Sequence, residues 1–488
     1  MTLTSYDQPA PPRGFPVSRT GQRSRSHRGL LVGLTAASIG LISGYDVASI
    51  GGALLFITDA FGLTAPDQEL VTTALAVGDI AGALSAGALA NAIGRRKSLM
   101  LVAASYAVFA VLGATSGSLS VLVLARLSAG VAIGVSYVVV PVFVAESAPA
   151  RVRGGLLVSY QATNVIGMIV GYLTAYLLGG PQSWRWVLGL AAVPAVVVWV
   201  LLRRVGDTAR WYLLKGRVGE ARQALQRGHA DVDDELAGIR KALDEERTGV
   251  SAVAEMMRRP YRRATVFVVV LGFLVQITGI NAIISYGPLL LGSMGLRGNF
   301  SLLVLPALVQ VFALAAVLVS LVLVDRLGRR PVLLSGIATM VVANLALVVS
   351  FAHGGNSGGG WPAAFGVFGV LLFVCGFNVG FGPLACVYAG ESLPARLRSI
   401  GSAAMHTSNL VANAIVAAFF LTLLSSLGGV ATFTVLGVLA QIGFVYVHRY
   451  APETKGSQLE RIRHVWAAGG PDDRVRVAEA PHRVALTG

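Results

Sequence analysis

The chain has 488 residues, of which 55% are hydrophobic and only 13% are charged. Soluble domains carry about 25% charged residues, so this composition excludes a soluble globular protein and predicts an integral membrane protein. Cys375 and Cys386 are the only cysteines and lie in one apolar run, which excludes a disulfide framework and a cysteine-based metal site. The net charge of +15 would suit a nucleic-acid partner, but the distribution of the basic residues offers another explanation.

Twelve segments are long and apolar enough to cross a bilayer, whose hydrocarbon core requires about 20 helical residues. Open sheets cannot span lipid, and the strand-length alternation of a barrel is absent, so we expect an all-α integral membrane fold with twelve transmembrane helices. The first segment is too long for a signal-peptide core and is expected to be retained. In chain order the segments are about 30–57, 70–91, 98–115, 119–145, 155–179, 186–205, 264–292, 302–325, 331–352, 361–390, 400–424 and 430–450.

All but three of the 39 lysine and arginine residues lie at the termini or in the even-numbered connections; the exceptions are Arg126, Arg185 and Arg297. Cytoplasmic loops carry such an excess, so we expect a cell-membrane protein with both termini in the cytoplasm and no nucleic-acid partner. The predicted organisation is a disordered N-terminal tail (1–29), an N-terminal six-helix bundle (30–205), a cytoplasmic linker with short helices (206–263), a C-terminal six-helix bundle (264–450) and a cytoplasmic C-terminal tail (451–488).

The two halves of the chain carry the same loop motifs. Asn91-Ala-Ile-Gly-Arg-Arg-Lys follows the second segment, and Asp325-Arg-Leu-Gly-Arg-Arg follows the eighth. Glu146-Ser-Ala-Pro-Ala-Arg-Val-Arg follows the fourth segment, and Glu391-Ser-Leu-Pro-Ala-Arg-Leu-Arg follows the tenth. Six-helix repeats of this kind place a substrate site at their interface near the bilayer midplane, which favours a transporter over a channel or a membrane enzyme.

These motifs place carboxylates at helix ends and arginines on facing short loops, where they can form charge-assisted hydrogen bonds. Such pairs can close one side of a transporter and break when the halves rock apart. The alternative is that the arginines only set the orientation in the membrane, but the duplication of both motifs favours a gate. The predicted cytoplasmic gate comprises Arg95, Arg96, Glu146, Arg153, Asp325, Arg329, Arg330, Glu391 and Arg398.

An ordered set of motifs runs through both halves of the chain. It comprises Gly44-Tyr45-Asp46, Gly94-Arg95-Arg96, Arg126, the segment Pro141 to Gly154, Trp184-Arg185-Trp186, Ala209-Arg210-Trp211-Tyr212, Gly216-Arg217, the segment Gln276 to Asn281, the segment Asp325 to Arg330, Gly382-Pro383, Glu391 and Pro452-Glu453-Thr454-Lys455-Gly456. With this set the sequence resembles, over residues 30–460, the sugar porters of the major facilitator superfamily. The resemblance implies two six-helix bundles that work by alternating access as a monomer, with no cofactor and no chemical turnover. A membrane enzyme would need a nucleophile, a metal site or an acid–base cluster, and the sequence offers none.

Asp46 lies in the middle of the first segment, where an ionisable residue costs about 2.5–3.5 kcal/mol on insertion scales and needs a partner or a function. Arg126 is the only basic residue within the fourth segment and is the expected partner. In the proton-coupled porters that these positions resemble, the helix-one acid takes up a proton and the helix-four arginine favours its ionised form. The resemblance therefore implies that Asp46 carries the proton, with a static salt bridge as the alternative.

Asp79 in the second segment departs from the family pattern, which more often has a small or apolar residue there. It is a candidate for a second proton-coupling residue or for the counter-charge of a cationic substrate. The structural alternative is a carboxyl group that is hydrogen-bonded to neighbouring serines or to the backbone.

The resemblance also implies a substrate site made of amide side chains, which offer both donors and an acceptor to hydroxyl groups. Gln161, Gln276, Asn281 and Asn409 fall on these positions. The alternative use of each amide is an interhelical hydrogen bond, worth about 0.6 kcal/mol.

Several family positions for binding a sugar are changed, including those that supply aromatic rings for its C–H face. Two functions therefore remain open. The first is proton-coupled symport of a sugar or sugar-like small solute, and the second is proton-driven export of a small metabolite or drug, for which Asp79 would suit a cation. The changed positions hold Val275, Ser285, Ala313, Cys386 and Leu410.

Overall fold

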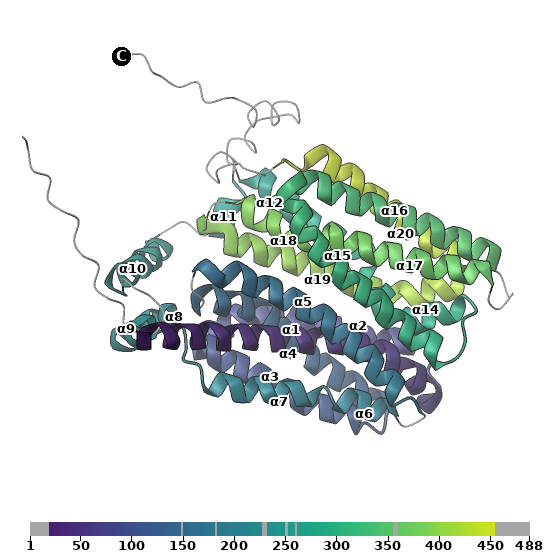
Figure 1. Ribbon diagram of the computed structural model, residues 1–488, viewed down its shortest axis with the longest axis horizontal. Helices are drawn as coiled ribbons and strands as arrows, with labels where there is room; N and C mark the ends of the chain where they lie inside the picture. The colour runs from purple at the N-terminus through teal and green to yellow at the C-terminus, as the bar shows by residue number, and fades with distance from the viewer. Residues whose placement is uncertain are drawn as a thin grey trace, which may run out of the picture.

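The computed structural model describes residues 19–147, 150–180, 183–226, 232–248, 252–258, 261–354, 360–393 and 395–453. Within these ranges the regular secondary structure is entirely helical. Figure 1 shows two bundles lying side by side, the first in purple to teal and the second in green to yellow. We call these bundles the first half (α1–α7) and the second half (α12–α20).

The first half contains six spans. They are α1 (Arg19–Phe61), α2 (Ala65–Ile93), α3 (Arg95–Ala114), α4 (Leu119–Ser147), α5 (Ala150–Leu177), and the pair α6 (Ser183–Gly189) with α7 (Ala192–Arg203). The prediction of a disordered tail is wrong for residues 19–29, because α1 begins at Arg19. Hydropathy marks where a helix enters lipid, whereas a helix propagates while each added residue makes a backbone hydrogen bond.

Four short helices form the described part of the connection between the halves. They are α8 (Ala209–Leu214), α9 (Val218–Gln226), α10 (Val232–Thr248) and α11 (Ala252–Met256). Ala209, Ala221, Leu225 and Leu236 form a small apolar core of their own. All four helices lie at one end of the bundles, on the left of Figure 1. We call this the linker end and the opposite end the far end.

The second half also contains six spans. Helix breaks interrupt two of them, at Gly279 and at Gly380. The spans are α12 (Arg262–Ile277) with α13 (Ile280–Ser285) and α14 (Gly287–Ser293), the π-helix η1 (Phe300–Val304) with α15 (Leu305–Leu327), α16 (Arg329–Gly354), α17 (Trp361–Val379) with α18 (Phe381–Glu391), α19 (Ala395–Ser426) and α20 (Gly428–Tyr450). Gly279 separates α12 from α13 with a φ of 95°, a conformation that glycine adopts without strain. The predicted C-terminal tail lies outside the described residues from residue 454 onward.

The described residues include 11 helical segments long and apolar enough to cross a membrane. The remaining predicted span is α5, a helix of 28 residues that packs along α1. Large apolar side chains such as Val108, Phe312 and Leu345 are exposed on the outside of the bundles, as a lipid-facing surface requires. The predicted all-α fold with twelve transmembrane helices is therefore confirmed.

Helix packing within the first half depends on small residues. Gly78 and Gly82 of α2 lie directly against the backbone of α4. On α4, a Cβ atom added to Gly134 would lie 2.1 Å from the carbonyl oxygen of Asp79. Between the halves, α2 packs against α19, α5 packs against η1 and α15, and α1 packs against α13 and α14.

Candidate functional site

The structure brings Asp46 and Arg126 together inside the first half. Arg126 Nη1 donates to both carboxylate oxygens of Asp46, over 2.8 and 3.0 Å. The Tyr106 hydroxyl on α3 donates to Asp46 Oδ1 over 2.8 Å. Asp46 and Arg126 are only 5% and 4% exposed. Three helices thus hold a carboxylate beside a small cavity that Ser49, Leu188 and Ala191 also line.

This arrangement leaves two nitrogen atoms of the Arg126 guanidinium without a hydrogen bond among the described residues. Arg126 Nε and Nη2 are buried and have no hydrogen-bond partner among the described residues. Asp46, by contrast, accepts three hydrogen bonds in its ionised form. A proton on Asp46 would remove the attraction between opposite charges and free the guanidinium, which is the chemistry that proton coupling requires. The geometry is compatible with coupling, while the role of the pair remains a prediction.

Asp79 is buried in the same half, with 4% of its surface exposed. Its Oδ1 atom has no hydrogen-bond partner within the described part of the chain, so serines or backbone groups do not satisfy that atom. Asp46 and Arg126 are close enough to act on Asp79 electrostatically. A buried carboxylate oxygen that lacks a partner is costly, and either a proton or an incoming cation would reduce that cost.

The four amides lie on both halves. Gln161 belongs to α5 in the first half, whereas Asn409 belongs to α19 in the second. Gln276 and Asn281 lie on either side of the helix break at Gly279, and the buried Gln276 Oε1 has no partner among the described residues. The helix that carries Gln276 packs against the helix that carries Asn409. The structure describes no hydrogen bond between any two of the four, so their role as a substrate site remains a prediction.

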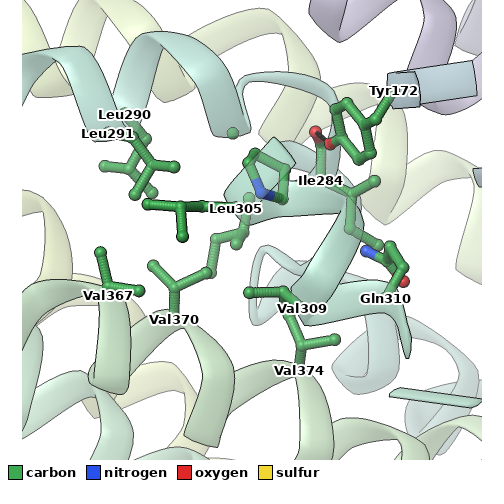
Figure 2. A pocket seen from close by; sticks show the side chains of 13 residues that line it. Tyr172, Ile284, Leu290, Leu291, Leu305, Val309, Gln310, Val367, Val370 and Val374 are labelled. Carbon is green, nitrogen blue, oxygen red and sulfur yellow. Dashed lines mark hydrogen bonds between the residues drawn. The ribbon is translucent and has the colours of Figure 1, made fainter. Parts of the chain in front are cut away.

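Figure 2 shows an apolar cavity in the second half, lined by residues of α13, α14, α15 and α17. The hydroxyl of Tyr172, from α5, donates to the carbonyl oxygen of Ile284 at its edge. Gln310 is 3% exposed and contributes an amide to this lining. The sequence analysis missed Gln310, although a lone amide in the apolar run 302–325 is a recognisable signal.

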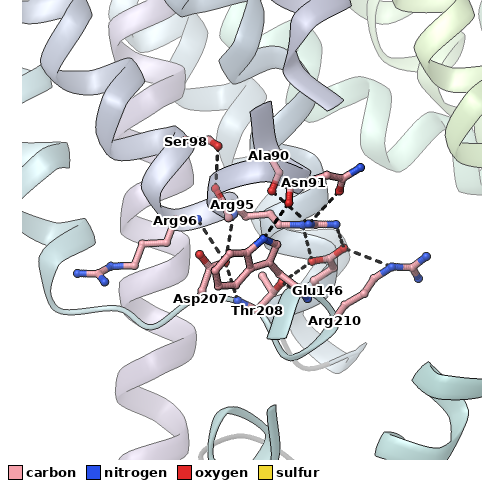
Figure 3. A network of polar contacts seen from close by, with 11 residues as sticks. Ala90, Asn91, Arg95, Arg96, Ser98, Glu146, Asp207, Thr208 and Arg210 are labelled. Carbon is pink, nitrogen blue, oxygen red and sulfur yellow. Dashed lines mark hydrogen bonds and ion pairs between the residues drawn. The ribbon is translucent and has the colours of Figure 1, made fainter. Parts of the chain in front are cut away.

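At the linker end of the first half, the Glu146 carboxylate contacts three side chains, as Figure 3 shows. Arg95 Nε lies 3.1 Å from Glu146 Oε2, and Arg95 Nη2 lies 3.2 Å from Oε1. The Thr208 hydroxyl donates to Oε2 over 2.6 Å, and Arg210 Nε lies 3.8 Å from Oε1. The carboxylate therefore joins α3, α4 and the start of the linker.

Asp207 is a member of this network that the sequence analysis missed. Its Oδ1 atom accepts from the backbone N–H groups of Arg95, Arg96 and Thr208, over 3.1, 3.4 and 2.9 Å (Figure 3). Burial raises the pKa of the Asp207 carboxyl above its ordinary value, and the hydrogen bonds from the three N–H groups oppose that shift. The side chain thereby satisfies N–H groups at the start of α3, which have no partner within the helix.

The second half repeats this arrangement. Arg329 Nη2 lies 3.5 Å from Glu391 Oε1, and Arg329 Nη1 lies 3.9 Å from the exposed Asp325. Glu453 accepts from the backbone N–H groups of Arg329 and Arg330, over 3.0 Å each, at the start of α16. Glu453 therefore occupies the place in the second half that Asp207 occupies in the first.

The ion pairs of the predicted gate lie within each half, and the gating role of these residues stays a prediction. Each ion pair described at the linker end joins residues of a single half and its adjoining loops, so these pairs do not link the two halves in this structure. The physical reason is that the motifs are duplicated, and each arginine meets a carboxylate of its own repeat. The Arg153 side chain lies outside the described side chains. The buried Arg398 Nε has no hydrogen-bond partner within the described residues.

Comparison with known proteins gives a consistent result. The family model described as "Sugar (and other) transporter" matches residues 32–466. The galactose-proton symporter of Escherichia coli is 32% identical over 453 residues, which cover 92% of this chain and 96% of the relative. The arabinose-proton symporter of the same organism is 31% identical over 454 residues, which cover 92% and 95%.

Solved structures show the same fold. The proton:xylose symporter XylE bound to 6-bromo-6-deoxy-D-glucose aligns with a TM-score of 0.75 at 23% identity, covering 91% of this chain and all (100%) of that one. A partially occluded inward open conformation of XylE from E. coli aligns with a TM-score of 0.76 at 21% identity, covering 88% and 100%.

Proposed function

The chain belongs to the sugar (and other) transporter family, a family of multi-pass membrane transporters, and from that premise we propose that it carries a sugar or sugar-like solute together with a proton across the cell membrane. The observation that carries the proposal is the buried Asp46–Arg126 pair with the Tyr106 hydroxyl beside it. A charged pair within a membrane span costs free energy, so its presence next to a cavity supports a role in transport.

In the proposed cycle Asp46 takes up a proton from the side to which the solute site is open. The proton bonds to a carboxylate oxygen, the negative charge disappears, and Arg126 loses its ionic partner. The first half then rocks relative to the second, and the proton leaves to water on the opposite side as the pair re-forms. Because the site opens to one side of the membrane at a time, the solute and the proton cross together.

The solute is expected to bind between the halves, where the four amides would face its hydroxyl groups. Amides suit a polyhydroxylated solute because a buried donor or acceptor left without a partner penalises a solute that lacks the matching group. The relatives transport galactose and arabinose with protons by name, which supports sugars as the first substrates to examine. We expect the chain to act as a monomer with both termini and the linker in the cytoplasm.

The test is uptake into proteoliposomes at fixed membrane potential, with and without an inward proton gradient, using labelled galactose, arabinose, xylose, an inositol and an aminosugar. The Asp46→Asn variant should lose gradient-driven accumulation while retaining exchange of the same solute. Asp67→Asn is the matched control, because Asp67 accepts hydrogen bonds from Thr64 within the first half and is expected to leave accumulation unchanged. Accumulation that persists in Asp46→Asn would contradict the assignment.

Export of a cationic solute is the second candidate, and the unpartnered Asp79 Oδ1 favours it. In the same assay, an outward-directed exporter would show no sugar accumulation in folded protein. It would show proton efflux when a labelled organic cation is taken up by vesicles, abolished by Asp79→Asn. Sugar accumulation that survives Asp79→Asn would exclude an essential counter-charge at this position.

A further inference from the structure

A buried carboxylate joins the two halves at the far end. Glu69, near the start of α2, is 5% exposed. Its Oε1 atom accepts from the backbone N–H of Thr422 over 2.7 Å, and its Oε2 atom accepts from the Thr422 hydroxyl over 2.6 Å. Thr422 lies near the end of α19 in the second half. One side chain therefore makes two short, charge-assisted hydrogen bonds across the division between the halves.

Two aromatic contacts at this end involve no charged group. The Tyr286 ring stacks on Phe420 with 5.7 Å between centroids, and its hydroxyl donates to the carbonyl oxygen of Ala417 over 2.8 Å. Between the halves, the rings of Tyr176 and Phe300 meet edge to face. Apolar contacts have little directional preference, whereas a carboxylate that receives two donors requires one register of α2 against α19.

We propose that Glu69 and Thr422 form a latch that holds the two halves together at the far end and opens each time the solute site faces that side. Alternating access separates the halves at one end while they close at the other, so hydrogen bonds between Glu69 and Thr422 exist in only one of the two states. The closed state gains them, while in the open state water must replace them. The pair therefore sets the ratio of the two states without touching solute.

The latch goes beyond the proposed function, because it concerns the two conformations and not the cargo. Its measurement needs neither sugar nor a proton gradient. Failure of sugar uptake would thus leave the latch standing, and failure of the latch would leave sugar symport standing.

The chain offers a closely matched control. Asp67 lies two residues before Glu69 in α2, and it also accepts hydrogen bonds from the N–H and the hydroxyl of one threonine. That threonine is Thr64, in the same half, so the Asp67 bonds do not cross between the halves. Glu69→Ala and Asp67→Ala therefore each remove a carboxylate that accepts two hydrogen bonds from one threonine, buried in the first case and more exposed in the second. Only the first variant breaks a contact between the halves.

The experiment measures the distance between the far ends of the two halves by double electron–electron resonance in lipid nanodiscs. Spin labels are attached at Ser118→Cys in the first half and Leu427→Cys in the second, both exposed positions, after Cys375 and Cys386 are replaced by alanine. Relative to the labelled parent, Glu69→Ala should raise the ratio of the long-distance to the short-distance population by at least about tenfold, since it removes two hydrogen bonds to a charge. Asp67→Ala should leave the ratio unchanged.

Thr422→Val and Thr422→Ser provide a second pair of variants. Valine replaces the hydroxyl by a methyl group and leaves the backbone N–H, so the long-distance population should rise by about threefold. Serine keeps the hydroxyl donor and should match the parent. If Glu69→Ala does not fold, this pair decides the question. Equal distance distributions for Thr422→Val and Thr422→Ser, or for Glu69→Ala and Asp67→Ala, would overturn the latch.

Discussion

At the scale of single residues, Asp207 and Glu453 occupy equivalent places in the two halves. Each carboxylate accepts the first backbone N–H groups of the helix that follows a Gly-Arg-Arg loop, α3 in one half and α16 in the other. Acidic side chains suit this position because the N–H groups of the first turn lack partners and carry partial positive charge. The backbone N–H groups of the loop arginines thus donate to one carboxylate in each half. The side chains of Arg95 and Arg329 form ion pairs with a second carboxylate, that of Glu146 or Glu391.

Replacing Asp207 by alanine should destabilise the first half. Three backbone N–H groups would lose their acceptor, and loss of a helix cap costs about 0.5–2 kcal/mol. Thermal unfolding of the purified protein should show a lower midpoint for Asp207→Ala. Asp207→Asn should lie closer to the parent, since asparagine caps nearly as well. Asp325→Ala is the control, because the Asp325 side chain is 82% exposed and its removal is expected to change the midpoint little. Equal midpoints for both alanine variants would contradict the capping role.

The sequence predicts some of these residues and not others, for a physical reason. Asp46 and Arg126 each stand out as a charge within an apolar span, so the cost of burial alone suggests the pair. Asp207 and Glu69 lie where charges are common, near a loop and at a span boundary. Arg95 lies 112 residues from Asp207 in the chain and Thr422 lies 353 residues from Glu69, so only the folded structure reveals these two contacts.

At the scale of the helices, glycines determine how closely α2 and α4 approach. Gly78 and Gly82 face α4, and Gly130 and Gly134 face α2, so the two backbones meet without intervening side chains. This contact fixes the part of α2 that carries Asp79 against the helix that carries Arg126. The sequence predicts the spans from hydropathy, but it does not predict the breaks at Gly279 and Gly380, because glycine is also frequent in unbroken membrane helices.

Substituting alanine for Gly134 should separate α2 from α4. The added Cβ would lie 2.1 Å from the Asp79 carbonyl oxygen, so the backbones must move, and overpacking of this kind costs about 1–3 kcal/mol. Gly87→Ala, on α2, is the control, because no atom lies within 4 Å of a Cβ built there. The thermal midpoint should fall for Gly134→Ala and stay near the parent value for Gly87→Ala. A Gly134→Ala protein with unchanged stability would show that the contact adapts at no cost.

At the scale of the whole molecule, the ion pairs described at the linker end stay within a half, whereas Glu69 and Thr422 link the halves at the far end. Along their length, α2 meets α19 and α5 meets α15 across the division. Each half can therefore move as a body while its own loops remain intact. The duplicated motifs predict the two halves from the sequence. They do not predict which end of the transporter is closed, because the two conformations have the same sequence and the same covalent structure.

The linker end should face the cytoplasm. Basic residues concentrate at that end, and the excess is the signal that orients membrane proteins. In a protein without native cysteines, a membrane-impermeant thiol reagent added to whole cells should label Leu427→Cys at the far end and leave Arg240→Cys in the linker unlabelled. Permeabilised cells should give labelling at both positions, since both are exposed. Labelling of Arg240→Cys in intact cells would reverse the proposed orientation.

The contrast between the two ends also bears on how the chain is made. The network around Glu146 and Asp207 uses residues up to Arg210, so it can close while the ribosome is still synthesising the second half. Glu69 has its partner 353 residues later, near the end of the last helix but one. Until that helix inserts, the carboxylate has only water or lipid headgroups at the membrane edge. The Glu69–Thr422 contact can therefore form only after α19 has been made, later than the network of the first half.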